Sequence, residues 1–155
     1  MRGPFDSRHP LVGLIDEISR LNGRLKSTFA AVRRAAGLNE SEMMVLNAVV
    51  EAERLPTVAQ IGRSLGNPRQ LVQRAANALL AGGLIEAAPN PDHKRAALLR
   101  ATASGIALKR KADARADEVA GGMAASLDPA AVRAVTHELR ALRKQLEAQL
   151  RGGEE

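Results

Sequence analysis

The 155-residue chain contains no cysteine, tryptophan or tyrosine and only two phenylalanines. The absence of cysteine excludes disulfides, thiolate nucleophiles, Cys-ligated zinc and thiol-based redox sensing, and nothing argues for an oxidising compartment. Two aromatic rings also leave few platforms on which unpaired bases could stack, which disfavours single-stranded nucleic acid as a partner. Function must therefore rest on charged, polar and aliphatic side chains.

Long apolar runs are absent as well. The N-terminus "MRGPFDSRHPLVGLIDEIS" has no apolar run of signal-peptide length, and no segment approaches the ~20 apolar residues of a membrane span. We therefore expect a cytoplasmic protein with no membrane partner. The sequence also has no phosphate-binding glycine loop, nucleophile elbow or zinc spacing, and His9 and His137 lack partners at metal spacing. No catalytic residue, metal or cofactor is expected, and an enzyme is disfavoured.

The charge is unevenly distributed. The chain has 23 Lys and Arg against 17 Asp and Glu, a net charge of +6. Between Arg54 and Lys111 there are ten basic and two acidic residues, a net +8, so the remainder carries −2. This length fits one domain with or without extensions, and the basic middle segment favours an anionic partner such as nucleic acid.

Apolar spacing predicts a long N-terminal helix followed by a shorter one. Residues about 9 to 36 have apolar side chains every three or four positions, with Gly37 as the stop. The next helix begins at Asn39, with Glu42 at capping-box spacing. The inward residues expected of the two helices are Leu11, Leu14, Ile18, Leu21, Leu25, Phe29 and Val32, then Met43, Leu46, Val49 and Val50.

Two further helices lie close together in "TVAQIGRSLGNPRQLVQRAANALLAGG". Thr57 and Gln60 repeat the capping-box spacing, and Gly66 ends an element of about eight residues whose inward residues are expected to be Val58, Ile61 and Leu65. Asn67, Pro68 and Gln70 then fit the cap, first and third positions of a helix that ends at Ala81.

The C-terminal half predicts a β-hairpin and two helices. "LIEAA" and "AALLRA" are short candidate strands, and "PNPDHKR" between them holds the turn formers Pro, Asn and Asp. A helix should run from Thr102 to about Ser126, followed by one that Asp128 caps and Pro129 opens. Val132, Val135, Leu139, Leu142, Leu146 and Leu150 form a packing row on that last helix, which a dimer partner or the chain's own core would cover.

The two short helices joined by "LGNP" indicate a helix-turn-helix. In the second helix, Val72, Ala75, Ala76, Leu79 and Leu80 are expected to pack inward, which leaves Arg69, Gln70, Gln73, Arg74 and Asn77 on the opposite face. These side chains suit base edges and phosphates in the major groove of duplex DNA. The basic hairpin tip of His93, Lys94 and Arg95 would reach the backbone or the adjacent minor groove. The plainer alternatives are a solvated helix face and an ordinary charged turn, and a solvated face is favoured for Lys109, Arg110 and Lys111.

The segment "TVAQIGRSLGNPRQLVQRAANALLAGGLIEAAPNPDHKRAALLRATASG" resembles the MarR-type winged helix-turn-helix transcriptional regulators in its order of helix, turn, helix, "GLI" strand, basic wing, second strand and Thr-x-x-Gly. The resemblance implies a mainly α fold with a two-stranded β wing. It implies a DNA-binding lobe at 38–101 and an intertwined homodimerisation region at 1–37 and 102–155. It also implies a cytoplasmic regulator, expected to be a repressor, that binds palindromic double-stranded DNA and permits release by a small-molecule effector, for which Phe5 and Phe29 are the available rings.

The helix-turn-helix pattern and the family resemblance together predict the site residues. The recognition helix is assigned Asn67, Arg69, Gln70, Gln73, Arg74 and Asn77, and the wing His93, Lys94 and Arg95. DNA backbone contact is assigned to Thr57, Arg63 and Ser64, and dimerisation to Leu11, Leu14, Ile18, Leu139, Leu142 and Leu146.

The sequence departs from the family pattern in three places. The family's wing usually carries Asp-x-Arg, whereas here His93 precedes Lys94 and Arg95, and Asp92 stands one place earlier. Pro68 stands where Ser is frequent, and Leu71 where a small polar residue is common.

The alternative function is a winged-helix protein-interaction adaptor without sequence-specific DNA binding.

Overall fold

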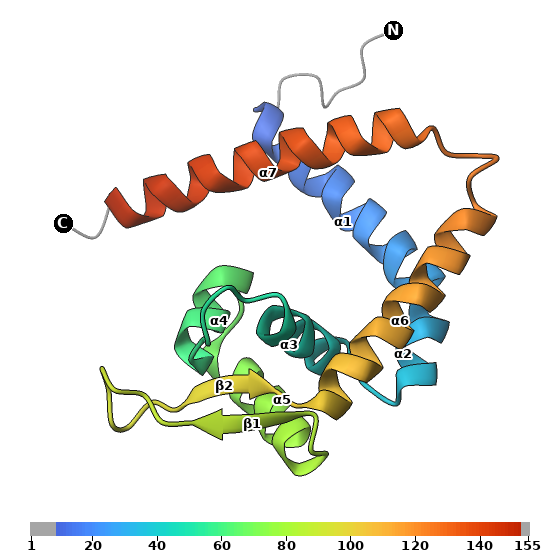
Figure 1. Cartoon of the computed structure of the whole chain (residues 1–155). Helices are drawn as coiled ribbons and strands as arrows, with labels where there is room; N and C mark the ends of the chain where they lie inside the picture. The colour runs from blue at the N-terminus through green and yellow to red at the C-terminus, as the bar shows by residue number, and fades with distance from the viewer. Residues whose placement is uncertain (1–8, 153–155) are drawn as a thin grey trace, which may run out of the picture. The chain divides into compact units, whose positions relative to one another are not determined.

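The structure is a computed structural model that describes residues 9–152, and this range forms seven helices and one two-stranded sheet (Figure 1). The elements are α1 (Pro10–Thr28), α2 (Ala30–Ala36), α3 (Glu40–Val50), α4 (Val58–Leu65), α5 (Arg69–Ala81), β1 (Ile85–Ala88), β2 (Leu98–Ala101), α6 (Ala103–Gly122) and α7 (Pro129–Gly152). The predicted class, mainly helical with a β-hairpin after a helix-turn-helix, is confirmed. Within residues 9–152, no helix combines the length and the apolar character that a membrane crossing requires.

The chain divides into two compact units within α6, the first ending at Ala116 and the second beginning at Asp117. The first unit contains a hydrophobic core to which α3, α4, α5 and both strands contribute. Three-and-four spacing on the helices brings their apolar side chains to one interior, and each strand adds one residue to it. The core consists of Val45, Leu46, Val49, Ile61, Val72, Ala75, Ala76, Leu79, Ile85 and Leu99.

Both predicted capping boxes are confirmed. Asn39 Oδ1 accepts from the Glu42 backbone N–H at 2.9 Å, and Glu42 Oε2 accepts from the Asn39 N–H at 3.0 Å. Thr57 and Gln60 make the same reciprocal pair, at 3.2 and 2.9 Å. Each pair satisfies two backbone donors that a helix start otherwise leaves open. The boxes therefore fix where α3 and α4 begin.

The prediction of one helix over residues 9–36 is wrong at Phe29, where the backbone leaves helical geometry and separates α1 from α2. Just before the break, Thr28 Oγ1 donates to the Arg24 carbonyl at 2.9 Å. Such back-bonding from a Thr side chain bends helices. Across the break, Arg33 Nη2 donates to the Lys26 carbonyl at 3.0 Å, so a carbonyl at the end of α1 keeps a partner.

Two details of the helix-turn-helix differ from the prediction. Pro68, with ψ of 137°, is the cap of α5, and Asn67 makes no capping bond. The Asn67 N–H instead donates to the Gly62 carbonyl at 2.9 Å, which ties Asn67 to the end of α4. Leu65 is 37% exposed rather than inward, because Ile61 and Gly62 fill the buried positions of this short helix.

Three smaller expectations have mixed outcomes. On α3, Val45 is buried together with Leu46 and Val49, whereas Met43 and Val50 are only partly buried. The helix α6 ends at Gly122, four residues before the expected Ser126, where two consecutive glycines weaken helix propagation. The cap of α7 is confirmed, since Asp128 Oδ1 accepts from the Ala130 N–H at 3.0 Å.

The start of α6 is joined to the start of the hairpin. Thr102 Oγ1 donates to the Gly83 carbonyl at 2.7 Å and accepts from the Gly105 N–H at 3.1 Å. A Cβ on Gly105 would lie 2.0 Å from the Leu84 carbonyl oxygen, far inside van der Waals contact. The Thr-x-x-Gly spacing therefore has a structural cause: the threonine links helix to strand, and only glycine permits their approach.

Candidate nucleic-acid interface

The helix-turn-helix consists of α4 and α5, which pack against each other and are joined by Gly66, Asn67 and Pro68. On α5 the inward residues Val72, Ala75, Ala76 and Leu79 are buried, as expected from their spacing, and Leu80 packs against the same core. The opposite face is exposed along its whole length and carries Arg69, Gln70, Gln73, Arg74 and Asn77. The inward and outward faces predicted for this helix are thus found.

The residues assigned to DNA backbone contact lie on or next to α4. Arg63 and Ser64 are exposed, in the last turn of that helix. Thr57 is half-buried, and its hydroxyl already accepts the Gln60 N–H, which leaves its proton to donate. Asn67, which is assigned to the recognition helix, is half-buried in the turn that follows α4. Of these four, Arg63 and Ser64 are the most accessible to a ligand.

Two amides on the exposed face of α5 are joined. Gln73 Nε2 donates to Asn77 Oδ1 at 3.0 Å, a bond across one helical turn between two exposed side chains. A spacing of four residues brings side chains together on a helix surface. The two amides are therefore hydrogen-bonded to each other on the exposed face of α5.

The wing is an antiparallel hairpin in which Ile85 pairs with Ala101 and Ala88 with Leu98. Across it, Arg100 Nη1 lies 3.2 Å from Glu86 Oε1, an exposed ion pair on neighbouring strands. Burial of Ile85, Ala88 and Leu99 fixes the hairpin on the core. Its tip consequently extends from a rigid base.

An asparagine orders the wing tip. Asn90 Nδ2 donates to the Ala96 carbonyl at 2.8 Å, and Asn90 Oδ1 accepts from the Asp92 N–H at 3.1 Å. The Ala96 N–H in turn donates to the His93 carbonyl at 3.1 Å. The tip residues His93, Lys94 and Arg95 are all exposed. In the family's Asp-x-Arg pattern, the aspartate carboxylate would be the group expected to order the wing tip. In this chain the side-chain amide of Asn90 orders it.

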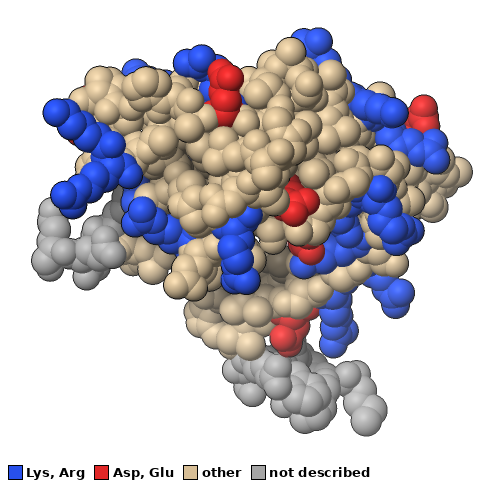
Figure 2. Space-filling model, turned by 90° about the horizontal axis from the view of Figure 1, so that it is seen from below, with Lys and Arg blue, Asp and Glu red and all other residues tan. Residues whose placement is uncertain are grey.

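Among the charged side chains on the side of α5 and the hairpin, basic ones outnumber acidic ones. Figure 2 views the molecule from that side, and blue Lys and Arg side chains are spread over it with few red acidic ones. The exposed basic residues of the helix-turn-helix and wing are Arg63, Arg69, Arg74, Lys94, Arg95 and Arg100. Of this set, Arg100 is paired with Glu86. The arrangement gives a cationic surface next to an amide-rich helix face.

Lys109 on α6 is buried, contrary to the solvated face favoured from the sequence, while Arg110 and Lys111 are exposed. Its Nζ lies 2.6 Å from Asp113 Oδ2 and 3.1 Å from Glu51 Oε1. Burial alone would lower the pKa of Lys109, but the hydrogen bonds and charges of Asp113 and Glu51 outweigh burial and raise that pKa. The spacing of four residues between Lys109 and Asp113 is the feature of the sequence that could have predicted this ion pair.

A model of the MarR family matches residues 36–96. The uncharacterized protein Rv2011c of Mycobacterium tuberculosis is 35% identical over 136 residues, which span 88% of this chain and 94% of that protein. The chain belongs to the MarR family. The resemblance seen in the helix, turn, wing and Thr-x-x-Gly order is thereby confirmed.

Solved MarR structures share this fold. A MarR-family transcriptional regulator from Rhodococcus sp. RHA1 matches with a TM-score of 0.76 at 20% identity, covering 88% of this chain and 96% of that one. CouR from Rhodococcus jostii RHA1, bound to p-coumaroyl-CoA, matches at 0.72 and 20%, covering 92% and 95%. A mutant MarR from E. coli in complex with operator DNA matches at 0.70 and 19%, covering 91% and 99%.

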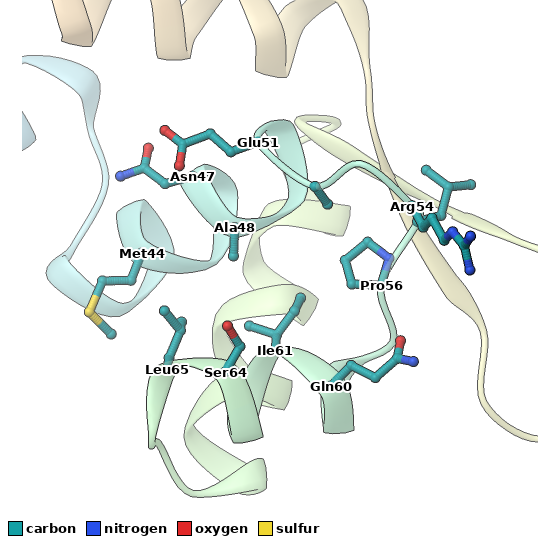
Figure 3. A pocket seen from close by; sticks show the side chains of 12 residues that line it. Met44, Asn47, Ala48, Glu51, Arg54, Pro56, Gln60, Ile61, Ser64 and Leu65 are labelled. Carbon is teal, nitrogen blue, oxygen red and sulfur yellow. The ribbon is translucent and has the colours of Figure 1, made fainter. Parts of the chain in front are cut away.

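The MarR fold of this chain has two hollows beside α3. The larger, about 650 Å³, lies between α3, the segment 51–57 and α4 (Figure 3). Met44 and Leu65 lie at one end of it and Arg54 at the other. Asn47 contributes to this hollow, and its Oδ1 is shielded from solvent without a hydrogen-bond partner among the described residues.

The smaller hollow, about 300 Å³, is lined from α2, α3 and α6. Phe29, one of the two rings expected for effector stacking, is among its lining residues, and Phe5 lies outside the described residues. Met43, which the sequence predicted to face inward, also lines this hollow, and Met44 lines both hollows. Asp113, a partner of Lys109, also borders this hollow.

The end helices of this MarR chain carry exposed apolar rows. On α1, Leu11 and Ile18 are 37% and 43% exposed, and Leu14 is half-buried. On α7, Leu146 is 44% exposed, and Leu139 and Leu142 are half-buried. Apolar rows of this kind, on long helices, are typical of surfaces that another helix covers.

Proposed function

We propose that this MarR-family chain is a homodimeric transcriptional repressor that binds palindromic double-stranded DNA. The observation that carries the proposal is the exposed face of α5, where two arginines and three amide side chains stand together while the opposite face is buried in the core. Arginine and amide side chains are the groups that recognise guanine and adenine in the major groove. The match to the MarR family supports a regulator rather than an enzyme.

The recognition helix α5 would lie in the major groove. Its N-terminal end, with Arg69 and Gln70, would enter deepest, and Gln73, Arg74 and Asn77 would follow along the groove. Asn67 would contact DNA from the turn before this helix, and Thr57, Arg63 and Ser64 would contact phosphates on the flanks. Such contacts set register and orientation, while base contacts set sequence preference.

The wing tip would reach the adjacent minor groove. A narrow minor groove has an enhanced negative potential that attracts arginine and lysine. Arg95, supported by Lys94 and His93 on a tip that Asn90 holds in shape, fits this role. E. coli MarR, whose complex with operator DNA shares this fold, supports DNA as the partner.

Two copies would pair through their end helices. Residues 38–101 would form the DNA-binding lobe, and residues 1–37 and 102–155 the dimerisation region. The exposed apolar rows of α1 and α7, which include Leu11, Leu14, Ile18, Leu139, Leu142 and Leu146, would be covered in the dimer. A two-fold dimer presents two recognition helices to half-sites about 34 Å apart, one helical turn of DNA.

A small-molecule effector would act from a hollow beside α3. CouR was solved with p-coumaroyl-CoA, and its fold matches this chain. The smaller hollow joins α2, α3 and α6, so an occupant would alter how the recognition lobe is held. Occupation would then lower DNA affinity, and gene expression would rise.

The test combines assembly with salt dependence. A homodimer should be found by light scattering, and binding to a duplex selected from a random pool should weaken as salt rises. If a dimer neutralises about eight phosphates, log K should fall with log salt at a slope near −7. A flat salt response, or a monomer at micromolar concentration, would contradict the proposal. A salt-resistant complex with a protein in place of DNA would favour the adaptor alternative.

A further inference from the structure

We propose that Gln73 and Asn77 read a single adenine as one unit, an inference that rests on the proposed DNA-binding function. The observation is the 3.0 Å hydrogen bond from Gln73 Nε2 to Asn77 Oδ1 on the exposed face of α5. Both side chains are exposed, so the pair is open to a ligand. The pair stands in the middle of the surface that would enter the major groove.

The bond leaves a defined set of groups for a ligand. Gln73 Oε1 is left as an unshared acceptor and Asn77 Nδ2 as an unshared donor, while Gln73 Nε2 keeps one proton and Asn77 Oδ1 one lone pair. Reversing the roles, with Asn77 donating to Gln73, leaves one carbonyl and one amino group again. The pair therefore presents an acceptor beside a donor in either arrangement.

Adenine is the base whose major-groove edge matches this set. It presents the N6 amino donor beside the N7 acceptor. Gln73 Oε1 would accept from N6, and Asn77 Nδ2 would donate to N7. Guanine presents two acceptors, O6 and N7, so one of them would face the Gln73 carbonyl. Thymine presents an acceptor and a methyl group, and cytosine a donor alone.

Pairing also explains why the two amides would act together. A long polar side chain loses rotamer freedom when it is fixed on a base. Here the bond between Gln73 and Asn77 restricts both side chains before DNA arrives. Removal of either one loses its own base contact and also frees the other, so each alanine variant should lose most of what the double variant loses.

The experiment is selection of binding sites from a random duplex pool by the full-length chain and by three variants, Gln73→Ala, Asn77→Ala and the double variant. Gln70→Ala is the matched control, because it removes an exposed amide from the same helix but not from the pair. Each selected site is then measured by titration against duplexes with all four bases at the affected position. Alanine is a good helix former, so α5 should persist, and circular dichroism checks this.

The wild-type chain should prefer adenine by about tenfold at one position of each half-site. Both single variants should lose the preference at that same position, the double variant should lose no more than about twofold beyond either, and Gln70→Ala should retain it. Loss at two different positions, additive losses, or preference for another base would overturn the adenine unit while leaving the DNA-binding function intact. Enrichment of no sequence by the wild-type chain would overturn both.

Discussion

Lys109 Nζ lies 3.1 Å from Glu51 Oε1, so a buried ammonium group on α6 is joined to the residue that ends α3. The same Nζ lies 2.6 Å from Asp113 Oδ2 on its own helix. Glu51 borders the larger hollow and Asp113 the smaller one. Lys109 therefore connects α6 with the end of α3, and its two carboxylate partners border the two hollows proposed for an effector.

The first prediction concerns the stem of Lys109. Lys109→Ala should lower the free energy of unfolding by about 2 kcal/mol, because it removes a buried aliphatic chain. Lys109→Met should restore most of that loss, since methionine fills similar volume and the exposed carboxylates of Glu51 and Asp113 return to water. Urea unfolding measures both. A methionine variant as unstable as the alanine variant would show that the ion pairs, rather than packing, hold this contact.

The same lysine predicts an alkaline dependence of stability. Its pKa is raised in the folded chain above the usual 10.5, so its contribution to stability is complete below that pH and is lost as pH rises through the folded value. The chain has no tyrosine or cysteine to titrate in this range. Lys109→Met should therefore lose less stability than the wild type between about pH 10 and 12. Parallel curves would rule out a role for Lys109 in the alkaline loss.

The close approach of α6 to Leu84, the residue before β1, predicts a steric effect at Gly105. Gly105→Ala should destabilise the protein by about 3 kcal/mol, because its Cβ would lie 2.0 Å from the Leu84 carbonyl oxygen. Gly121→Ala on the same helix is the control, since its Cβ meets nothing within 4 Å. Thermal unfolding compares the two. Equal stability of the two variants would mean that α6 and the hairpin approach less closely than described.

Asn90 should matter for DNA affinity more than for stability. Asn90→Ala removes the bonds to the Ala96 carbonyl and the Asp92 N–H, which leaves the wing tip without its internal order. We expect a loss of about 1 kcal/mol or less in unfolding free energy and a several-fold loss of affinity for the selected duplex. Arg95→Ala should weaken binding as well. If Asn90→Ala binds as tightly as the wild type, the tip needs no preset shape.

Arg74 should contribute to sequence preference. Arg74→Ala should cost about 1–3 kcal/mol on the selected site and much less on random duplex, as expected for a base contact. Arg110→Ala removes the same charge from an exposed position on α6 and serves as the control. Fluorescence anisotropy at fixed salt gives both affinities. Equal losses on both duplexes would reduce Arg74 to a phosphate contact.

The exposed apolar row on α7 should carry the dimer. Leu146→Asp should give a monomer and abolish measurable operator binding, because a charge would be buried in an apolar helix contact. Lys144→Asp, an exposed position almost opposite on the helical wheel of α7, should remain dimeric. Light scattering separates the two results. If the Leu146→Asp variant is still a dimer, the dimer interface does not include Leu146.

Much of the local structure follows from interactions between residues that are near in sequence. The capping boxes at Asn39 and Thr57, the glycine stops at Gly37 and Gly66, and the cap at Asp128 each involve groups within a few positions of one another. The outward face of α5 follows from helical periodicity in the same way. These features can be predicted from the sequence because the interactions that stabilise them join residues that are close in sequence.

The sequence by itself determined the order of helices and hairpin, the two faces of α5 and the membership of a family that shares this order. The tertiary structure alone decided that Lys109 is buried between two carboxylates, that Leu65 faces a hollow, and that only glycine fits at position 105. Each of these depends on which atoms of the folded chain come within contact distance, and the spacing of residues along the chain does not contain that information.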